Sequence, residues 1–274
     1  MTELSKQAKT KGKIIGFVPT MGYLHEGHLS LIRAARKRCD ILVVSIFVNP
    51  IQFGPKEDLK NYPRDLKRDI KLVSPLKADY LFVPDKDDIL PEDFSSFVDV
   101  PGLSEKLCGR SRPGHFRGVA TIVAKLFNIV NPDIAFFGEK DFQQLAIIKK
   151  MVSDLNMGVK VIGMPTIREP DGLAMSSRNV FLSANERTSA AAIYRSLKLA
   201  ERMVEGGEDR AVNIIKAMKK LLSRERPKII IDYVQACDPV TLESVNRIKG
   251  ETLIAVAAYP GPTRLIDNIL VRGE

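Results

Sequence analysis

The chain contains no tryptophan, few aromatic residues and few cysteines. Aromatic side chains make up 7% of its 274 residues. Its three cysteines, Cys39, Cys108 and Cys237, lie far apart, so the sequence offers neither a disulfide framework nor a Cys-x-x-Cys metal site. No run approaches roughly 18 uncharged apolar residues, and the start, "MTELSKQAKTKGK", is polar. These absences predict a soluble, cytoplasmic protein without a secretion signal or membrane span.

Signatures of several enzyme classes are also missing. The sequence has no GxGxxG dinucleotide fingerprint, no HExxH zinc motif and no GxSxG nucleophile turn. Its net charge of +9 is compatible with nucleic acid, an anionic membrane or phosphate-bearing small molecules. Because the basic residues are spread along the chain without interleaved aromatic residues, we do not expect nucleic acid as a partner.

Apolar runs of strand length alternate with amphipathic runs of helix length as far as residue 165. The predicted strands cover 14–18, 40–48, 78–84, 134–138 and 159–165, and the predicted helices cover 27–38, 64–73, 118–130 and 141–155. This alternation predicts βαβ units around a buried parallel sheet, which is an α/β, Rossmann-like domain. Such sheets bind ligands beyond the carboxyl ends of the strands, where the strand order reverses.

A second, smaller α/β domain is predicted after the polar stretch "REPDGLAMSSRN" (168–179), which is long enough to act as a hinge. The predicted helices beyond it cover 185–207 and 209–226, and the predicted strands cover 228–236, 252–260 and 263–271. We therefore expect one domain over residues 1–166 and another over 167–274.

Two of the three histidines, His25 and His28, lie in "VPTMGYLHEGHLSLI". Spaced three apart they could share a helix face and bind a metal, but further ligands at suitable spacing are missing. The spacing of a P-loop is nearly present, yet His28 and Leu29 stand where its Lys and Ser/Thr belong. What remains is a strand, a turn and a helix N-terminus, which attracts anions such as phosphate. The alternative is that both histidines simply cap the helix and pack against it.

Two further segments carry groups that suit phosphate. In "FFGEKDFQQL", Gly138 allows close backbone approach, Lys140 is a point charge and Gln144 lies one helical turn later. In "GLAMSSRN", serine hydroxyls and the Arg178 guanidinium could clamp pyrophosphate oxygens. Each segment alone could equally be a solvated polar loop. The third histidine, His115, lies in the basic stretch "GRSRPGHFRG", which is typical of a protein surface.

Taken together and in this order, six motifs closely resemble the pantothenate synthetase (pantoate–β-alanine ligase) family. They are "PTMGYLHEGH", "SIFVNPIQF", "YPRD", "SRPGHFRGVATIV", "FGEKDFQQL" and "REPDGLAMSSRN", and the resemblance runs from about Gly16 to "RLIDN". The family belongs to the nucleotidyltransferase superfamily related to class I aminoacyl-tRNA synthetases. "HEGH" is similar to its HIGH motif and "MSSR" to its KMSKS loop. The stretch before "PTMG" is shorter than usual in the family, which leaves an N-terminal helix open.

The resemblance implies ATP-dependent condensation of pantoate with β-alanine through a pantoyl adenylate, releasing AMP and pyrophosphate. It implies small-molecule partners, namely pantoate, β-alanine and ATP, with neither nucleic acid nor membrane. It also implies a homodimer and a C-terminal lid domain. Mg²⁺ is expected to be held through the ATP phosphates, with no protein metal ligands.

The resemblance also implies roles for individual residues. Catalytic roles fall on His25, His28, Lys140 and Arg178. ATP contacts fall on Thr20, Met21, Gly22, His25, His28, Gly138, Lys140, Asp141, Ile167 (at the adenine), Met175, Ser176, Ser177 and Arg178. Pantoate contacts fall on Asn49, Gln52 and Gln144.

Two other function classes share some of these features. A nucleotidylyltransferase with a phosphorylated acceptor also carries the HxGH element, but needs Arg or Lys where this chain has Gln52 and Gln144. A non-enzymatic nucleotide- or RNA-binding protein would bind RNA with a steep salt dependence and would not exchange pyrophosphate.

Overall fold

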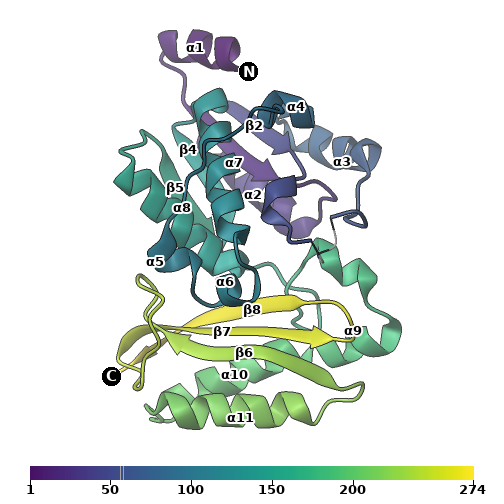
Figure 1. Ribbon diagram of the computed structural model, residues 1–274, viewed down its shortest axis with the longest axis vertical. Helices are drawn as coiled ribbons and strands as arrows, with labels where there is room; N and C mark the ends of the chain where they lie inside the picture. The colour runs from purple at the N-terminus through teal and green to yellow at the C-terminus, as the bar shows by residue number, and fades with distance from the viewer. Residues whose placement is uncertain (56, 58) are drawn as a thin grey trace. The chain divides into compact units, whose positions relative to one another are not determined.

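The computed structural model describes residues 1–55, 57 and 59–274 (Figure 1). The chain forms two compact units. The first comprises Met1–Ser104, Arg112–Glu139 and Gln144–Pro165, and the second comprises Glu105–Ser111, Lys140–Gln143 and Thr166–Glu274. Two short pieces of the N-terminal part of the sequence therefore fold with the C-terminal residues.

The first unit is built on a five-stranded parallel sheet in the order β3-β2-β1-β4-β5. The strands are β1 (Ile15–Thr20), β2 (Ile41–Ile46), β3 (Tyr80–Phe82), β4 (Ile134–Gly138) and β5 (Lys160–Met164). Each lies within two residues or so of its predicted range. The sheet confirms the Rossmann-like fold expected from the strand–helix alternation.

One helix precedes these strands and the others connect them. They are α1 (Thr2–Thr10), α2 (Glu26–Arg36), α3 (Leu66–Val73), α4 (Lys86–Ile89), α5 (Pro101–Ser104), α7 (His115–Val130) and α8 (Phe142–Asp154), with the 3-10 turns η1 (Pro50–Gln52), η2 (Ser74–Leu76) and η3 (Glu139–Asp141). The N-terminal helix left open by the short lead-in is present as α1. α7 begins at His115 rather than at residue 118, after Gly114 with a φ of 81°.

The core of the first unit explains its uninterrupted apolar strands. Val18, Val44 and Phe136, from three neighbouring strands, are fully buried. Ile32 and Ala35 of α2 belong to the same hydrophobic cluster. A parallel sheet is covered by helices, so its strands are apolar at nearly every position.

The second unit contains an antiparallel sheet in the order β6-β7-β8. Its elements are β6 (Ile229–Cys237), β7 (Gly250–Pro260), β8 (Leu265–Gly273), α6 (Cys108–Ser111), η4 (Ser177–Phe181), α9 (Ala184–Ala190), α10 (Ala192–Glu205) and α11 (Ala211–Ser223). The single helix predicted over 185–207 is two helices that separate at Ala191.

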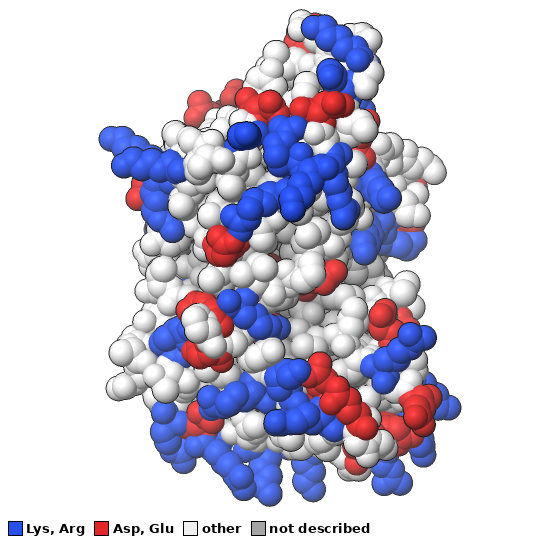
Figure 2. Space-filling view, turned by 180° about the vertical axis from the view of Figure 1, so that it is seen from behind, with Lys and Arg blue, Asp and Glu red and all other residues white. Residues whose placement is uncertain are grey.

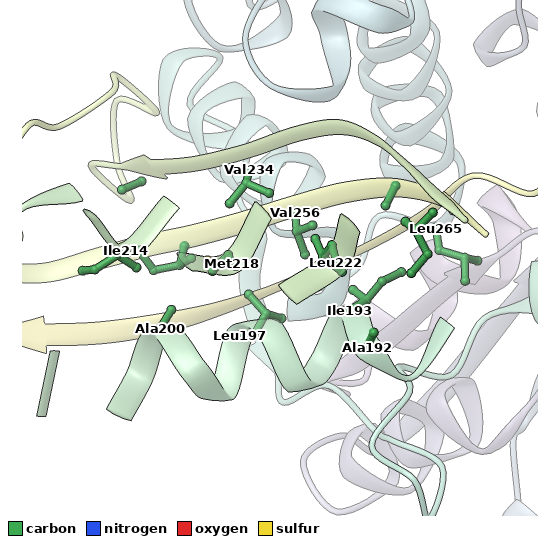
Figure 3. Packing of buried hydrophobic residues seen from close by; sticks show 14 of the residues in the cluster. Ala192, Ile193, Leu197, Ala200, Ile214, Met218, Leu222, Val234, Val256 and Leu265 are labelled. Atoms are coloured by element: carbon green, nitrogen blue, oxygen red, sulfur yellow. The ribbon is translucent and has the colours of Figure 1, made fainter. Parts of the chain in front are cut away.

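α10 and α11 bury their apolar stripes against one face of this antiparallel sheet (Figure 3). Leu197 and Met218, one from each helix, are fully buried, as is Val256 of the central strand. Every second residue of the central strand from Ile254 to Ala258 belongs to this hydrophobic cluster, so one face of the sheet packs against the two helices.

Charged side chains of both signs mix on the surface. Figure 2 shows Lys and Arg spread over the face it presents, with Asp and Glu among them. None of the described helices combines the length and the apolar character needed to cross a bilayer.

Candidate functional site

The turn after β1 is shaped by Thr20 and Gly22. The Thr20 hydroxyl donates to the Ser45 carbonyl at 2.7 Å and accepts the Gly22 N–H at 3.2 Å. Gly22 has a φ of 79°, and a Cβ there would lie 3.0 Å from Cγ2 of Ile46 and 3.1 Å from a carboxylate oxygen of Asp69. The turn therefore requires glycine, because other residues are strained at positive φ.

This turn lies where the strand order reverses. From β1 the chain proceeds to β2 and β3 on one side, then crosses to β4 and β5 on the other. Thr20 ends β1 and Gly138 ends β4, so these two predicted residues border the switch point at the carboxyl edge of the sheet. Open α/β sheets bind their ligands at this position.

Asp69 of α3 holds the residues that lead into α2. Its side chain is 1% exposed, and its two oxygens accept the N–H groups of Tyr23 and Leu24, each at 2.8 Å. Tyr23 has a φ of 51°, an uncommon conformation for a residue with a side chain, which these bonds secure. Sequence reasoning missed Asp69, since its helical pattern shows which face it occupies but not what it contacts.

His25 and His28 form a capping box at the start of α2. Nδ1 of His25 accepts the Gly27 N–H at 3.2 Å, and Nδ1 of His28 accepts the His25 N–H at 3.3 Å. The ring centroids are 4.1 Å apart. In both histidines Nδ1 therefore caps the start of α2, as the capping alternative predicts. A neutral imidazole that accepts at Nδ1 carries its proton on Nε2, so each Nε2 is a hydrogen-bond donor.

The metal alternative lacks ligands. Within residues 1–55, 57 and 59–274, no group of three or more His, Cys, Asp or Glu side chains is placed to hold a metal ion. Both histidines stand at the N-terminus of α2, which is the positive end of the helix dipole.

Asn49 and Gln52, at the end of β2, contact one another. The Asn49 amide donates to Oε1 of Gln52 at 2.9 Å and to the Gly118 carbonyl at 3.1 Å. Nε2 of Gln52 donates to the Met21 sulfur at 3.1 Å. Both side chains are buried. The contact between Gln52 and Met21 joins the segment after β2 to the turn after β1.

Residues of α7 support that segment. A Cβ on Gly118 would lie 2.3 Å from the Ile51 carbonyl oxygen, so only glycine permits this approach. Nδ1 of His115 lies 2.8 Å from the Gln52 carbonyl oxygen, and Nε2 lies 3.0 Å from Nη1 of Arg112. A carbonyl only accepts and a guanidinium only donates, so in these two contacts Nδ1 is the donor and Nε2 is the acceptor. His115 is buried, contrary to the expectation of a surface loop.

Lys140 and Asp141 lie on η3 and belong to the second unit. The Lys140 ammonium is 3.6 Å from an oxygen of Asp141. The Lys140 carbonyl accepts a hydrogen bond from the Asn268 side chain at 2.9 Å. Gln144 follows in the first turn of α8, half-buried and in the first unit.

The stretch predicted as a polar hinge contains a hairpin. Arg168 and Ala174 form an antiparallel bridge, and Met175 donates its N–H to the Ile167 carbonyl at 3.0 Å. The chain then enters η4, where the Ser176 hydroxyl accepts the Arg178 N–H at 3.3 Å. The predicted residues Ile167 and Met175 thus face each other across the hairpin, directly before the serines and Arg178.

Arg187 of α9 binds two acidic residues of this hairpin and fixes its position. It donates to Glu169 at 2.7 Å and also binds Asp171. The Arg187 hydrogen bond holds the pKa of Asp171 below its usual 3.8, although partial burial opposes this shift. Asn179 donates to Glu169 at 2.9 Å from the other end of the segment. Both ends of the Ser176–Arg178 stretch are therefore anchored.

Some of the predicted site residues belong to the first unit and the others belong to the second. Those in the first unit are Thr20, Met21, Gly22, His25, His28, Asn49, Gln52, Gly138 and Gln144. Those in the second are Lys140, Asp141, Ile167, Met175, Ser176, Ser177 and Arg178. The contacts above join Met21 to Gln52 within the first group, and Ile167 to Met175 within the second.

Comparison with known proteins covers nearly the whole chain. The family model described as pantoate-beta-alanine ligase matches residues 1–270. A pantothenate synthetase of Caldicellulosiruptor bescii is 53% identical over 100% of this chain and 97% of its own length. One of Syntrophotalea carbinolica is 56% identical over 98% of this chain and 94% of its own length.

Solved structures agree. Pantothenate synthetase from Thermus thermophilus matches with a TM-score of 0.90 and 44% identity, covering 93% of this chain and 92% of that one. The pantoate-beta-alanine ligase of Francisella tularensis, complexed with beta-gamma ATP and beta-alanine, matches with a TM-score of 0.78 and 35% identity. That match covers 98% of this chain and 94% of the ligase.

Proposed function

Because the chain belongs to the pantoate-beta-alanine ligase family, whose members are enzymes of the ligase class, we propose that it condenses pantoate with β-alanine, using ATP, through a pantoyl adenylate. The Francisella relative, complexed with an ATP ligand and β-alanine, supports ATP as co-substrate and β-alanine as acceptor. AMP and pyrophosphate are the other products.

One observation carries this proposal most directly. The capping box of His25 and His28 uses Nδ1 of each ring and so assigns the proton of each neutral ring to Nε2. Two such donors at a helix N-terminus, beside the switch point of a parallel sheet, suit the phosphates of a nucleotide. Neither ring has to act as a general base, since a carboxylate substrate is already ionised at neutral pH.

In the first half-reaction an oxygen of the pantoate carboxylate attacks the α-phosphorus of ATP. The bond from that phosphorus to the bridging oxygen of pyrophosphate breaks, and pyrophosphate leaves with both bonding electrons. His25 and His28 donate to the phosphate oxygens as their negative charge shifts. Lys140 and Arg178 supply positive charge to phosphate, and this kind of stabilisation dominates phosphoryl and nucleotidyl transfer.

Neutral amides suit the pantoate end. Asn49 and Gln52 are buried and joined to one another, so their positions are fixed before substrate binds. With Gln144 they serve the hydroxyls and carboxylate of a hydroxy acid without adding charge. A phosphorylated acceptor would instead favour Arg or Lys at these positions.

In the second half-reaction the neutral amine of β-alanine attacks the acyl carbon of the adenylate. A carbon–nitrogen bond forms, the bond from that carbon to the AMP oxygen breaks, and AMP leaves while the nitrogen loses a proton.

We expect Mg²⁺ to bind through the phosphate oxygens of ATP and through water. The described residues form no group of three or more His, Cys, Asp or Glu side chains that could hold an ion by themselves. Bound in this way, the ion would neutralise charge on the leaving pyrophosphate. We also expect the enzyme to be cytoplasmic, as its cysteine content indicates, and homodimeric, as the family resemblance implies.

Pantoate-dependent exchange of labelled pyrophosphate into ATP tests the proposal. Exchange should require pantoate, should not require β-alanine, and should be accompanied by pantothenate formation when β-alanine is added. Exchange that instead depends on a phosphorylated acceptor would point to a nucleotidylyltransferase. Steeply salt-dependent RNA binding without any exchange would point to a binding protein.

A further inference from the structure

The motif "RLIDN" (264–268) marks the C-terminal end of the family resemblance, and none of the roles described above falls on its residues. Its last two residues, Asp267 and Asn268, lie side by side on β8. Their backbones pair with Val256 and Ala255 of β7 in an unbroken antiparallel register. Their side chains make contacts to two segments that are remote in sequence.

Asn268 reaches the turn that carries Lys140. Its side-chain Nδ2 donates to the Lys140 carbonyl oxygen at 2.9 Å, across 128 positions of sequence. A hydrogen bond to the main chain fixes the place from which the lysine side chain starts. The Lys140 side chain is itself 18% exposed, so most of its stem is confined.

Asp267 reaches the hairpin that leads into Ser176–Arg178. Its carboxylate, 2% exposed, accepts from Nη1 and Nη2 of Arg168 at 2.6 and 3.1 Å. The same guanidinium donates to the Gly172 carbonyl at 3.1 Å and lies 4.1 Å from the centroid of the Tyr194 ring. A two-point bond to a planar guanidinium fixes orientation as well as distance.

From these contacts we propose that Asp267 and Asn268 are positioning residues, which set the two phosphate-binding segments of the second unit relative to one another. The inference rests on the proposed function of Lys140 and Arg178 in binding ATP phosphates. Successive side chains of a strand point to opposite faces of the sheet. The consecutive residues Asp267 and Asn268 therefore hold the Arg168 hairpin on one face of β8 and the Lys140 turn on the other.

The strand itself does not need these side chains to form. The backbone hydrogen bonds of β8 are independent of them, and a buried carboxylate is costly unless it is well paired. The contacts to Arg168 and to the Lys140 carbonyl therefore account for the presence of Asp267 and Asn268 at these positions. Small errors in placing a charge-stabilising group reduce turnover more than they reduce binding.

The test uses Asn268→Ala and Asp267→Asn in the full-length enzyme. Asn268→Ala should lower kcat of pantoate-dependent pyrophosphate exchange about five- to tenfold, which is the effect of one lost hydrogen bond, with KM for ATP changed less than about threefold. Asp267→Asn should also lower kcat. The controls are Gln235→Ala, which removes a side-chain amide bond on β6, and Asp232→Asn, which weakens an Arg–Asp pair of the same sheet. Both should keep wild-type kcat.

A double-mutant cycle separates positioning from general stability. In a Lys140→Ala background, Asn268→Ala should change kcat less than about twofold, because it acts through a lysine that is gone. A full-sized additional loss in that background overturns the inference. So does a wild-type kcat in Asn268→Ala when Lys140→Ala is impaired. If Lys140→Ala itself exchanges normally, the role of Lys140 in the proposed function fails, and the inference fails with it.

Discussion

The backbone nitrogen of Leu24 lies 2.8 Å from Oδ1 of Asp69, a buried carboxylate on α3. Because Oδ2 accepts the N–H of Tyr23 as well, one side chain fixes the two residues immediately before His25. The histidines owe their position to a residue more than forty positions away in the chain.

Asp69→Asn should therefore impair both stability and exchange activity. The amide offers only one acceptor oxygen, so one buried N–H loses its partner, at a cost of ~1–3 kcal/mol in the free energy of unfolding. Urea unfolding and pyrophosphate exchange measure the two effects. Asp65→Ala, which removes the N-cap of the same helix, is the matched control and should lower stability without a comparable loss of exchange. Normal exchange in Asp69→Asn would contradict the role given to this carboxylate.

Two amide substitutions of His28 should separate capping from catalysis. Asn places its oxygen near the position of Nδ1, which accepts the His25 N–H, whereas Gln places its amide nitrogen near Nε2. We expect His28→Asn to lose exchange at least ~10²-fold while α2 stays intact, since a charge-stabilising donor is removed. His28→Gln should retain more exchange and less stability. The reverse order of exchange rates would show that Nε2 is not the donor.

Gly118→Ala should disturb the segment that carries Gln52. The added Cβ would meet the Ile51 carbonyl oxygen at 2.3 Å and the Gln52 nitrogen at 2.8 Å, both of which are backbone atoms. Overpacking of this kind costs ~1–3 kcal/mol, so the melting temperature and pantoate-dependent exchange should both fall. Gly102→Ala, at a helical glycine where the new Cβ meets no atom within 4 Å outside its own helix and chain neighbours, is the control and should lower neither.

Gln52→Ala and Gln144→Ala should weaken pantoate binding selectively. If their amides serve pantoate, each loss leaves substrate groups unpaired at ~1–3 kcal/mol. The apparent KM for pantoate in pyrophosphate exchange should rise steeply, while calorimetric ATP affinity stays within a few-fold of wild type. Gln7→Ala on α1 serves as the control. Loss of ATP affinity with normal pantoate dependence would favour the phosphorylated-acceptor class instead.

The Asp171–Arg187 pair should contribute stability only when the carboxyl group is ionised. Its pKa in the folded protein lies below the ordinary 3.8 because of the Arg187 hydrogen bond. Its contribution is thus present above that value and is lost as the pH falls through the folded-state pKa. Asp171→Asn should be less stable than wild type at pH 7, by less than ~1 kcal/mol for so exposed a pair. Urea unfolding should show this difference shrinking as the pH is lowered past 3.8.

Most of the fold could be predicted from the sequence, because a buried parallel strand must be apolar and its connecting helix must be amphipathic. The break at Ala191 could not, since "TSAAAIYRS" contains neither glycine nor proline and every residue in it tolerates a helix. Only the packing of the second unit decides that α9 and α10 are separate.

The side chains that support the site were the harder part. His25, Lys140 and Arg178 could be selected by residue type and local pattern. Asp69 and Asp267 act through partners far away in sequence, and periodicity identifies the face that a residue occupies but not its partner. His115 was missed because its neighbours are basic, which indicates a surface loop, whereas the tertiary structure buries its ring.

The division of the chain into interleaved pieces bears on how such a gene can recombine. A crossover at the end of β5 would bring in Thr166–Glu274 from a relative but leave Glu105–Ser111 and Lys140–Gln143 from the original parent. Ser111 bonds to Asp232 and Cys108 approaches the Tyr233 hydroxyl at 3.0 Å, so these short pieces and the antiparallel sheet must change together. Chimeras that exchange all three segments should keep their parental side-chain contacts, whereas a single cut produces mismatched hybrids.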